Sequence, residues 1–271
     1  MPYFDHPDGL RLHYVERGGG PPLILLHGLL WSSRMFVRLR RRLDGHRVIL
    51  LDMRGHGLSE RPDDASLYTW AGFGSDVVAV MDHLGLEKAV VGGLSLGANV
   101  TLSTALDHPA RFAGLVVEMP VLWRARGFAE RLFTGLAGVL HAGGPVLRAS
   151  SPLVRRMPVP RSLPEAAAFR DVLGLDPLSA VAVIRGLLSD ELPDEADLSR
   201  LTMPALVIGH RRDPLHVLAD ARHLADRLPD ARFVSASSIL EYRVHPERLV
   251  SHLQPFLDEV WERDRTAKPA S

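Results

Sequence analysis

The segment GLSLG at residues 93–97 places Ser95 between two glycines, directly after an apolar run and before a helix-length segment. A serine hydroxyl attacks a carbonyl carbon effectively only when a neighbouring base takes its proton. A tight turn from a strand into a helix exposes such a serine, and the flanking glycines let the chain segments approach without Cβ clashes. The backbone N–H of Leu96 then lies at a helix start, where it can stabilise an oxyanion. We therefore predict that Ser95 is a nucleophile; the competing interpretation is a glycine-rich turn with an incidental capping serine.

A second segment, HGLL at residues 27–30, follows the apolar run LILL. It has the position expected for the other loop of an oxyanion hole, so the backbone N–H of Leu29 is the second candidate donor. We interpret His27 as a residue that shapes this loop rather than as a base.

Four segments in this order and spacing, LLHGLLWSS, LDMRGHGLSE, VVGGLSLGAN and LVIGHRRDP, resemble the α/β-hydrolase superfamily. They are most similar to its esterases, lactonases and enol-lactonases, and the resemblance runs from about Leu10 to Leu257. It implies a cofactor-independent hydrolase of carboxylic esters or lactones. Epoxide hydrolases and haloalkane dehalogenases of this fold use aspartate as nucleophile, where this chain has Ser95. The RGHG turn at residues 54–57 is interpreted as structural, because its glycines permit the turn.

The resemblance also implies a carboxylate and a histidine that follow the serine in that chain order. The carboxylate belongs in the loop after the strand that follows a variable cap, and the segment ALVIGHRRDP supplies Asp213 at that place. The competing interpretation is a helix N-cap, because Asp213 precedes Pro214 and a helical pattern. One carboxylate can serve both roles.

The histidine that the resemblance implies is missing from its usual place, so the triad looks incomplete. That place is the loop after the last strand, and counting back from Pro246 puts it at or next to Ile239. No histidine occurs between His223 and His245. Because losing a triad member commonly lowers the rate by orders of magnitude, the identity of the base decides what this chain can do.

In one interpretation a different histidine is the base. His216 lies three residues after Asp213, in a loop that should face Ser95, and is the leading candidate. Its competing interpretation is an ordinary pocket histidine. His245 is the remaining candidate and lies in the last loop, but its place directly before Pro246 is typical of the start of a surface helix.

Two further interpretations stay open. The site could belong to a lyase, cyclase or isomerase that polarises a carbonyl without an acyl-enzyme, with Glu118 or Glu241 as acid–base group if burial raises its pKa. Alternatively, the chain could be a ligand-binding protein with a retired active site. The intact GLSLG turn argues against the second of these, because a binding pocket does not need strain at Ser95.

Composition excludes several classes of function. The chain has 271 residues with 32 Lys and Arg against 32 Asp and Glu, so its formal charge of zero gives no reason to expect nucleic acid as a partner. It has no cysteine, which excludes disulfides, thiolate metal sites and a cysteine nucleophile. Its thirteen histidines lack metal-ligand spacing, and no dinucleotide fingerprint follows the first buried strand. We therefore expect no metal and no cofactor.

The N-terminal segment lacks the basic flank and apolar core of a signal peptide. No apolar run has the length that a bilayer requires. We expect a cytoplasmic protein without a membrane partner.

The elements that must position these residues alternate between strand and helix. The alternating segment 10–16 predicts a half-buried edge strand. Short apolar runs predict strands buried on both faces at residues 23–26, 48–51, 89–91, 115–117, 205–208 and 233–234. Between them lie helix-length segments at residues 33–43, 70–84, 96–106, 217–228 and 246–260. This alternation predicts an α/β fold, in which a mostly parallel central sheet is flanked by helices on both faces.

The alternation stops between residues 120 and 201, where no strand pattern occurs. We predict a core of residues 1–119 and 202–262, a helical cap of residues 120–201 over the C-terminal edge of the sheet, and a frayed tail at 263–271. The cap's aromatic residues Trp123, Phe128, Phe133 and Phe169 should form its own core or line an apolar pocket above Ser95. The expected partner is a small hydrophobic carbonyl compound.

Overall fold

A computed structural model describes residues 2–160, 164–238 and 241–267. Its centre is an eight-stranded sheet with the strand order β1-β2-β4-β3-β5-β6-β7-β8. The first two strands pair antiparallel, β2 pairs antiparallel with β4, and all later pairings are parallel. This confirms the predicted fold class. The strands are β1 Tyr3–Asp5, β2 Arg11–Arg17, β3 Pro22–Leu26, β4 Arg47–Asp52, β5 Ala89–Leu94, β6 Phe112–Glu118, β7 Ala205–His210 and β8 Ala231–Ala236.

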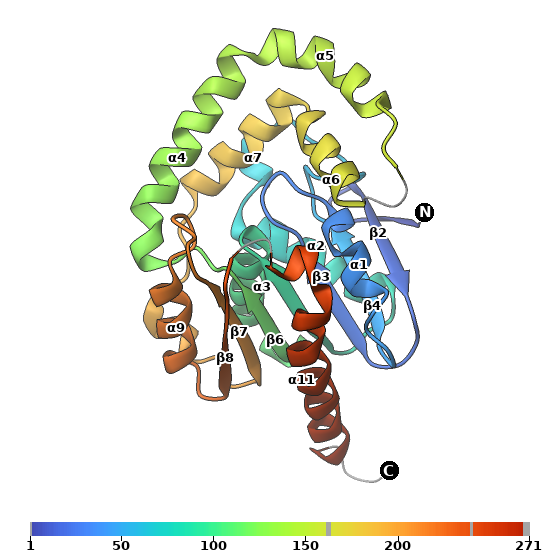
Figure 1. The fold of residues 1–271 in the computed structure, drawn as a ribbon, viewed down its shortest axis with the longest axis vertical. Helices are drawn as coiled ribbons and strands as arrows, with labels where there is room; N and C mark the ends of the chain where they lie inside the picture. Colours follow the sequence, from blue (N-terminus) through green and yellow to red (C-terminus); the bar gives the residue numbers. More distant parts are fainter. Residues whose placement is uncertain (1, 161–163, 239–240, 268–271) are drawn as a thin grey trace.

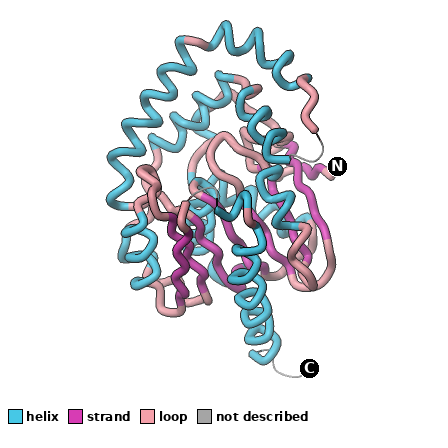
Figure 2. Tube along the Cα trace, viewed as in Figure 1, coloured by secondary structure: helices cyan, strands magenta, loops and turns pink. Residues whose placement is uncertain are grey.

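Helices cover both faces of the sheet (Figures 1 and 2). One apolar cluster joins the sheet to α2, α3 and α9, and a second joins the opposite face to α1 and α11. Since both faces are buried, the parallel strands are nearly continuous apolar runs. These helices and the short 3₁₀ turns are η1 Ser33–Phe36, α1 Val37–Arg40, η2 Ala65–Leu67, α2 Trp70–His83, α3 Leu96–Asp107, η3 Pro109–Arg111, α9 Leu218–Arg227, α10 Glu241–Val244 and α11 Pro246–Ala267.

Three predicted elements differ in the structure. The segment 10–16 is not an edge strand, because β1 pairs along its outer side with Tyr3 opposite His13. The helix predicted over residues 33–43 is only the turn η1 followed by the single turn α1. The frayed tail predicted from residue 263 is wrong for 263–267, which continue α11; residues 268–271 lie outside the described residues.

The connection from β6 to β7 is helical in all its described regular elements, which are α4 Trp123–Ala142, α5 Gly144–Arg156, α6 Pro164–Leu173, α7 Pro177–Ser189 and α8 Glu195–Leu198. In Figure 1, α4 and α5 form an arch along the outer rim of the molecule, with α6 and α7 beneath it. No single described helix combines the length and hydropathy needed to cross a bilayer; α6 and α7 reach them only when counted together across a bend of 90°. Because the parallel strands end at the edge nearest these helices, residues that follow β5, β6 and β7 meet there.

Candidate active site

Ser95 occupies the turn between β5 and α3 with strained backbone. Its φ of 53° and ψ of −110° lie in a region that residues other than glycine rarely adopt. Such a conformation costs about 1–3 kcal/mol and persists only where the surrounding structure enforces it. Here the Ser95 N–H donates to the carbonyl of Glu118 at 2.9 Å, which ties the turn to the end of β6.

The two glycines of GLSLG allow this turn to form. A Cβ on Gly93 would lie 2.1 Å from the carbonyl carbon of Gly97. A Cβ on Gly97 would lie 2.3 Å from the carbonyl oxygen of Leu26 in β3. Real Cβ atoms do not approach backbone so closely, so the predicted reason for both glycines is confirmed.

The loop after β7 brings an imidazole to the serine hydroxyl. His216 Nε2 lies 2.9 Å from Ser95 Oγ, and His216 Nδ1 lies 2.7 Å from Asp213 Oδ2. Both the His216 and the Asp213 side chains are only 7% exposed. The three residues that the sequence singled out therefore form one continuous hydrogen-bonded series.

The carboxylate of Asp213 is ionised in this arrangement. Burial raises its pKa, but hydrogen bonds from the His216 ring and from the N–H groups of His216 and Leu215 outweigh burial and lower the pKa below its usual value. A carboxylate accepts the proton on Nδ1, which leaves Nε2 as an acceptor for the hydroxyl of Ser95. This network assigns the tautomer that a general base requires.

Leu29 and Leu96, whose N–H groups are the expected oxyanion donors, line the same pocket as Ser95. The loop of Leu29 is fixed by His27, which is fully buried. His27 Nδ1 donates to the carbonyl of Gly28 at 2.9 Å, and Nε2 accepts the N–H of Met53 at 3.1 Å. Burial lowers the pKa of His27, so the ring is neutral with both nitrogens occupied, in agreement with a structural role.

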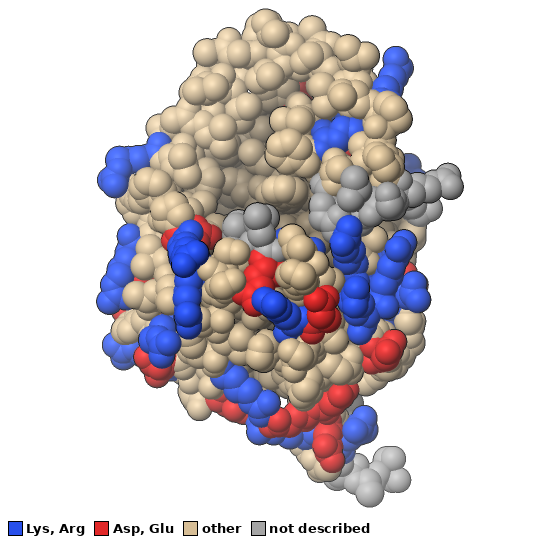
Figure 3. All heavy atoms as spheres, in the orientation of Figure 1, with Lys and Arg blue, Asp and Glu red and all other residues tan. Residues whose placement is uncertain are grey.

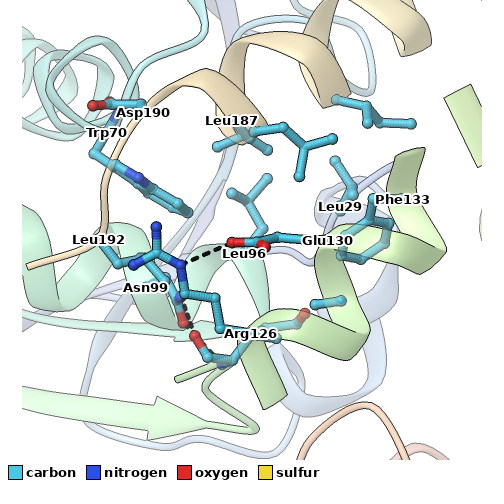
Figure 4. A pocket seen from close by; sticks show the side chains of 15 residues that line it. Leu29, Trp70, Leu96, Asn99, Arg126, Glu130, Phe133, Leu187, Asp190 and Leu192 are labelled. Atoms are coloured by element: carbon cyan, nitrogen blue, oxygen red, sulfur yellow. Dashed lines mark hydrogen bonds and ion pairs between the residues drawn. The ribbon is translucent and has the colours of Figure 1, made fainter. Parts of the chain in front are cut away.

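The pocket beside Ser95 is mostly apolar (Figure 4). Phe133 lines it, whereas Phe128 and Phe169 are 43% and 55% exposed and contribute to neither pocket nor core. Trp123 packs against the main apolar cluster. The apolar lining consists of Leu29, Trp70, Leu96, Val121, Ala129, Phe133, Ile184, Leu187, Leu188 and Leu192.

Four polar residues in the pocket wall were not anticipated from the sequence. Arg126 Nε donates to Glu130 Oε1 at 2.8 Å within α4, and Figure 4 shows the two side chains joined beside the pocket. Asp190 accepts the N–H of Trp70 at 2.7 Å, and Asn99 bonds both backbone groups of Val121. The spacing of four residues between Arg126 and Glu130 was the one available signal, since it places both on one side of a helix.

The two glutamates considered as acid–base groups are unsuited to that role. Burial raises the pKa of Glu118, but the Arg243 guanidinium and the hydrogen bond from His210 outweigh it and lower that pKa to about 2. Hydrogen bonds from Ser237 lower the pKa of Glu241 to about 2. The raised pKa that the lyase or isomerase interpretation requires is therefore wrong for both.

The last loop brings no described histidine to the serine. His245 is exposed at the start of α11, where its Nδ1 lies 3.1 Å from Glu247 Oε1. Ile239, the usual place of the base, lies outside the described residues. No group of three or more potential metal ligands lies together within the described ranges.

Comparisons with known proteins agree with this geometry. Residues 21–137 match the family model described as the alpha/beta hydrolase fold. RutD of Caulobacter sp. (strain K31), provisionally named a carbamate hydrolase, is 34% identical in an alignment that covers 83% of this chain and 85% of RutD. The pimeloyl-[acyl-carrier protein] methyl ester esterase of Shewanella sp. (strain MR-7) is 27% identical over 92% of this chain and 93% of its own. Among solved structures, the enol-lactonase from Burkholderia xenovorans LB400 superposes with a TM-score of 0.78 at 23% identity, over 95% of this chain and 100% of that enzyme.

Proposed function

Because this chain belongs to the α/β-hydrolase fold family and is a hydrolase, we propose that it cleaves carboxylic esters or lactones with a hydrophobic acyl or alcohol part, using Ser95 as nucleophile. The observation that carries the proposal is the series Asp213–His216–Ser95, with 2.7 and 2.9 Å between its polar atoms. His216 acts as the base in place of the histidine expected at or next to Ile239.

In the proposed reaction, Ser95 Oγ attacks the carbonyl carbon and its proton passes to His216 Nε2. The N–H groups of Leu29 and Leu96 stabilise the oxyanion, and the Asp213 carboxylate stabilises the imidazolium. The intermediate collapses by breaking the carbon–oxygen bond of the ester, and His216 gives the proton to the leaving alkoxide oxygen. Water then attacks the acyl-enzyme with His216 as base, releasing the acid and restoring the serine.

The same residues argue against the two other interpretations. A binding protein has no use for a nucleophile held at φ 53°, with an imidazole at hydrogen-bonding distance. The lyase or isomerase interpretation assigned acid–base catalysis to Glu118 or Glu241, and both carboxylates are ionised at neutral pH. Hydrolysis through Ser95 requires no further group.

The apolar pocket favours a hydrophobic substrate portion of modest size. The cavity measures about 100 Å³, and an engineered cavity of about 150 Å³ is known to hold benzene. The relative named for carbamate hydrolysis adds carbamate esters to the compounds worth testing, since they undergo the same acyl transfer.

The test is covalent labelling by a fluorophosphonate probe, followed by peptide mass spectrometry, and hydrolysis of p-nitrophenyl esters of increasing acyl length. We expect labelling at Ser95, activity greatest for short to medium acyl chains, and loss of both in His216→Ala. The matched control His245→Ala, an exposed histidine, should behave as the unmodified protein. No labelling at any pH, or full labelling in His216→Ala, would disprove the proposal.

A further inference from the structure

The outward faces of α4 and α5 carry an apolar stripe where a surface helix normally carries polar residues. On α4 the stripe consists of Phe128, Leu132 and Val139, spaced at i, i+4 and i+11 and 43%, 44% and 69% exposed. On α5 it continues with Val146 and Leu153, 75% and 72% exposed. We call these five residues the arch stripe.

The arch stripe is distinct from the pocket and from the cap's packed interior. The side of α4 that lines the pocket holds Arg126, Ala129 and Phe133, which lie on the opposite side of the helix from the stripe. On α5 only Gly144 and Ser151 are buried. The arch that Figure 1 shows above the body therefore exposes its large apolar side chains to solvent.

The same two helices carry excess positive charge. Residues 123–156 contain six arginines and one glutamate. Three of the arginines have carboxylate partners, since Arg126 pairs with Glu130, Arg124 with Asp220 and Arg148 with Asp176. Arg155 donates to a neutral carbonyl, and Arg131 and Arg156 form no ion pair with any residue in the described ranges. The charges of Arg131, Arg155 and Arg156 are therefore not balanced by a carboxylate partner. In Figure 3 the arch is mostly uncharged, with Lys or Arg side chains at its border.

We propose that the arch stripe docks this chain on an anionic lipid surface. Apolar side chains of an amphipathic helix enter the boundary between headgroups and acyl chains, while arginines at its border bind anionic headgroups. The expectation of no membrane partner concerned bilayer-spanning length. Lying on a surface needs no such length, so the lack of a spanning helix among the described residues does not oppose it. The inference goes beyond the proposed hydrolysis and does not depend on it.

Charge and shape favour lipid over a second copy of this chain. A two-fold interface through the stripe would set the same patch against itself, so that Arg131 and Arg156 would approach their own counterparts. Like charges at such a distance destabilise an interface. The two helices that carry the stripe also form the outer arch of the molecule (Figure 1), whose length a deformable lipid surface can follow.

The experiment is sedimentation of the full chain with vesicles of pure phosphatidylcholine, and with vesicles in which one-third of the lipid is phosphatidylglycerol. We expect binding to the anionic vesicles that weakens as salt is added, and little binding to the neutral ones. Leu153→Asp should lower the partition coefficient about tenfold or more, since one buried leucine is worth roughly that factor. Arg131→Glu/Arg156→Glu should abolish the preference for anionic lipid.

Matched controls separate this surface from a general loss of apolar area or charge. Val244→Asp replaces an apolar side chain that is 57% exposed on α10, and Arg200→Glu/Arg265→Glu changes the net charge equally away from the arch. Both should bind as the unmodified chain, and so should Ser95→Ala, which tests independence from catalysis. Absence of binding at low salt, or equal binding by stripe and control variants, would overturn the proposal. So would a dimer in light scattering that Leu153→Asp dissociates, because a second copy would then cover the stripe.

Discussion

Both carboxylate oxygens of Asp213 bond within the next three residues of the chain. Oδ1 accepts the N–H groups of Leu215 at 2.9 Å and of His216 at 3.0 Å, while Oδ2 accepts the ring N–H of His216. The turn that holds the carboxylate therefore also holds the imidazole, and few rotatable bonds separate them. The helix-cap interpretation of Asp213 is wrong, because α9 begins at Leu218 with Val217 as its N-cap; the N–H groups that Asp213 accepts belong to the turn before this helix.

Asp213→Asn tests this arrangement at the level of one atom. An amide would donate to His216 Nδ1 and place the ring proton on Nε2, the wrong tautomer for a base. We expect kcat/KM for the best ester to fall about 10²–10⁴-fold, with the melting temperature little changed. The exposed Asp230→Asn, which loses only its pairing with Arg263, should keep full activity. A fall of less than threefold in Asp213→Asn would contradict the role.

Among elements, the turn from β5 to α3 depends most on residue size. Gly93→Ala would force backbone apart at the 2.1 Å contact with Gly97, so we expect a loss of about 3 kcal/mol or more in the free energy of unfolding. Gly138→Ala on α4 meets no atom within 4 Å and should be neutral or stabilising by up to about 1 kcal/mol. Urea unfolding of both variants measures the difference. Equal stabilities would show that the turn can relax.

A buried ionic cluster ties the last loop to the strand ends. Glu118 at the end of β6 receives a hydrogen bond from the guanidinium of Arg243 on α10, and its Oε1 lies 3.0 Å from His210 Nε2 at the end of β7. The carbonyl of Glu118 also accepts the N–H of Ser95, so Glu118 directly contacts the turn between β5 and α3. The cluster thus holds α10 against the ends of β6 and β7.

Glu118→Gln removes the charge at the centre of this cluster. Breaking a buried ion pair while its cation stays in place costs about 3–5 kcal/mol, and we expect a loss of that order in urea unfolding. Glu259→Gln on α11, whose pairs with Arg232 and Arg263 are solvent-exposed, should cost about 1 kcal/mol or less. Similar losses in the two variants would mean that Arg243 and His210 find other partners.

Whether an element could be predicted from the sequence depends on how much of it is buried, because burial leaves an apolar pattern in the sequence. The runs that became β3 to β7 are apolar on both faces, so their existence could be predicted well, and the GLSLG turn marks where β5 ends. The prediction that residues 233–234 are buried on both faces is wrong, because β8 is the edge strand of the sheet and is only partly buried. The interior position of residues 10–16 could not be predicted, because the three-residue β1 that pairs along their outer side has no pattern of its own. The helix predicted over 33–43 is too long because the apolar spacing of this arginine-rich segment fits a helix throughout. In the structure Phe36, Leu39 and Leu43 are buried in the apolar cluster, and Met35 packs against it.

The site also contains residues that could be predicted from the sequence and residues that could not. Ser95, Asp213 and the loop of Leu29 could be predicted because their local turns are visible in the sequence. That His216 rather than another histidine reaches Ser95 could be named only as one candidate, since the meeting point of two loops 121 residues apart depends on strand order and side-chain rotamers. The place of Arg126 and Glu130 in the pocket could not be predicted, because the direction of α4 over the sheet is a property of the folded chain.

For the molecule as a whole, acid is expected to be destabilising. His56 is fully buried, and burial first, then the neighbouring His27, lowers its pKa from 6.5 to about 3. Below pH 6.5 the His56 ring is protonated in the unfolded chain but stays neutral in the folded chain. The contribution of His56 to stability is therefore complete above pH 6.5 and is lost as pH falls toward 3. The carboxylate of Glu118 acts in the same direction between pH 4.5 and about 2.

We therefore expect the melting temperature to fall steadily from pH 7 to pH 4. His56→Asn keeps a donor for the carbonyl of Arg54 but cannot titrate, so it should reduce the dependence of stability on pH across this window. Calorimetry of both proteins at several pH values measures the slopes. An exposed control, His245→Asn, should leave the slope unchanged, and parallel curves for His56→Asn would assign the acid sensitivity to other groups.

Under the proposed roles, the four-residue segment Asp-Pro-Leu-His at 213–216 supplies both the carboxylate and the base. A pair of groups that must stay within hydrogen-bonding distance is easier to keep when the same turn supplies both. Insertions or deletions in the last loop would then leave proton transfer intact, because the base lies in the loop after β7. An enzyme whose base lies in the last loop could not tolerate the same changes. A search for active members that demands a histidine after the last strand would pass over such chains, whereas one that also accepts Asp-x-x-His after the seventh strand would find them.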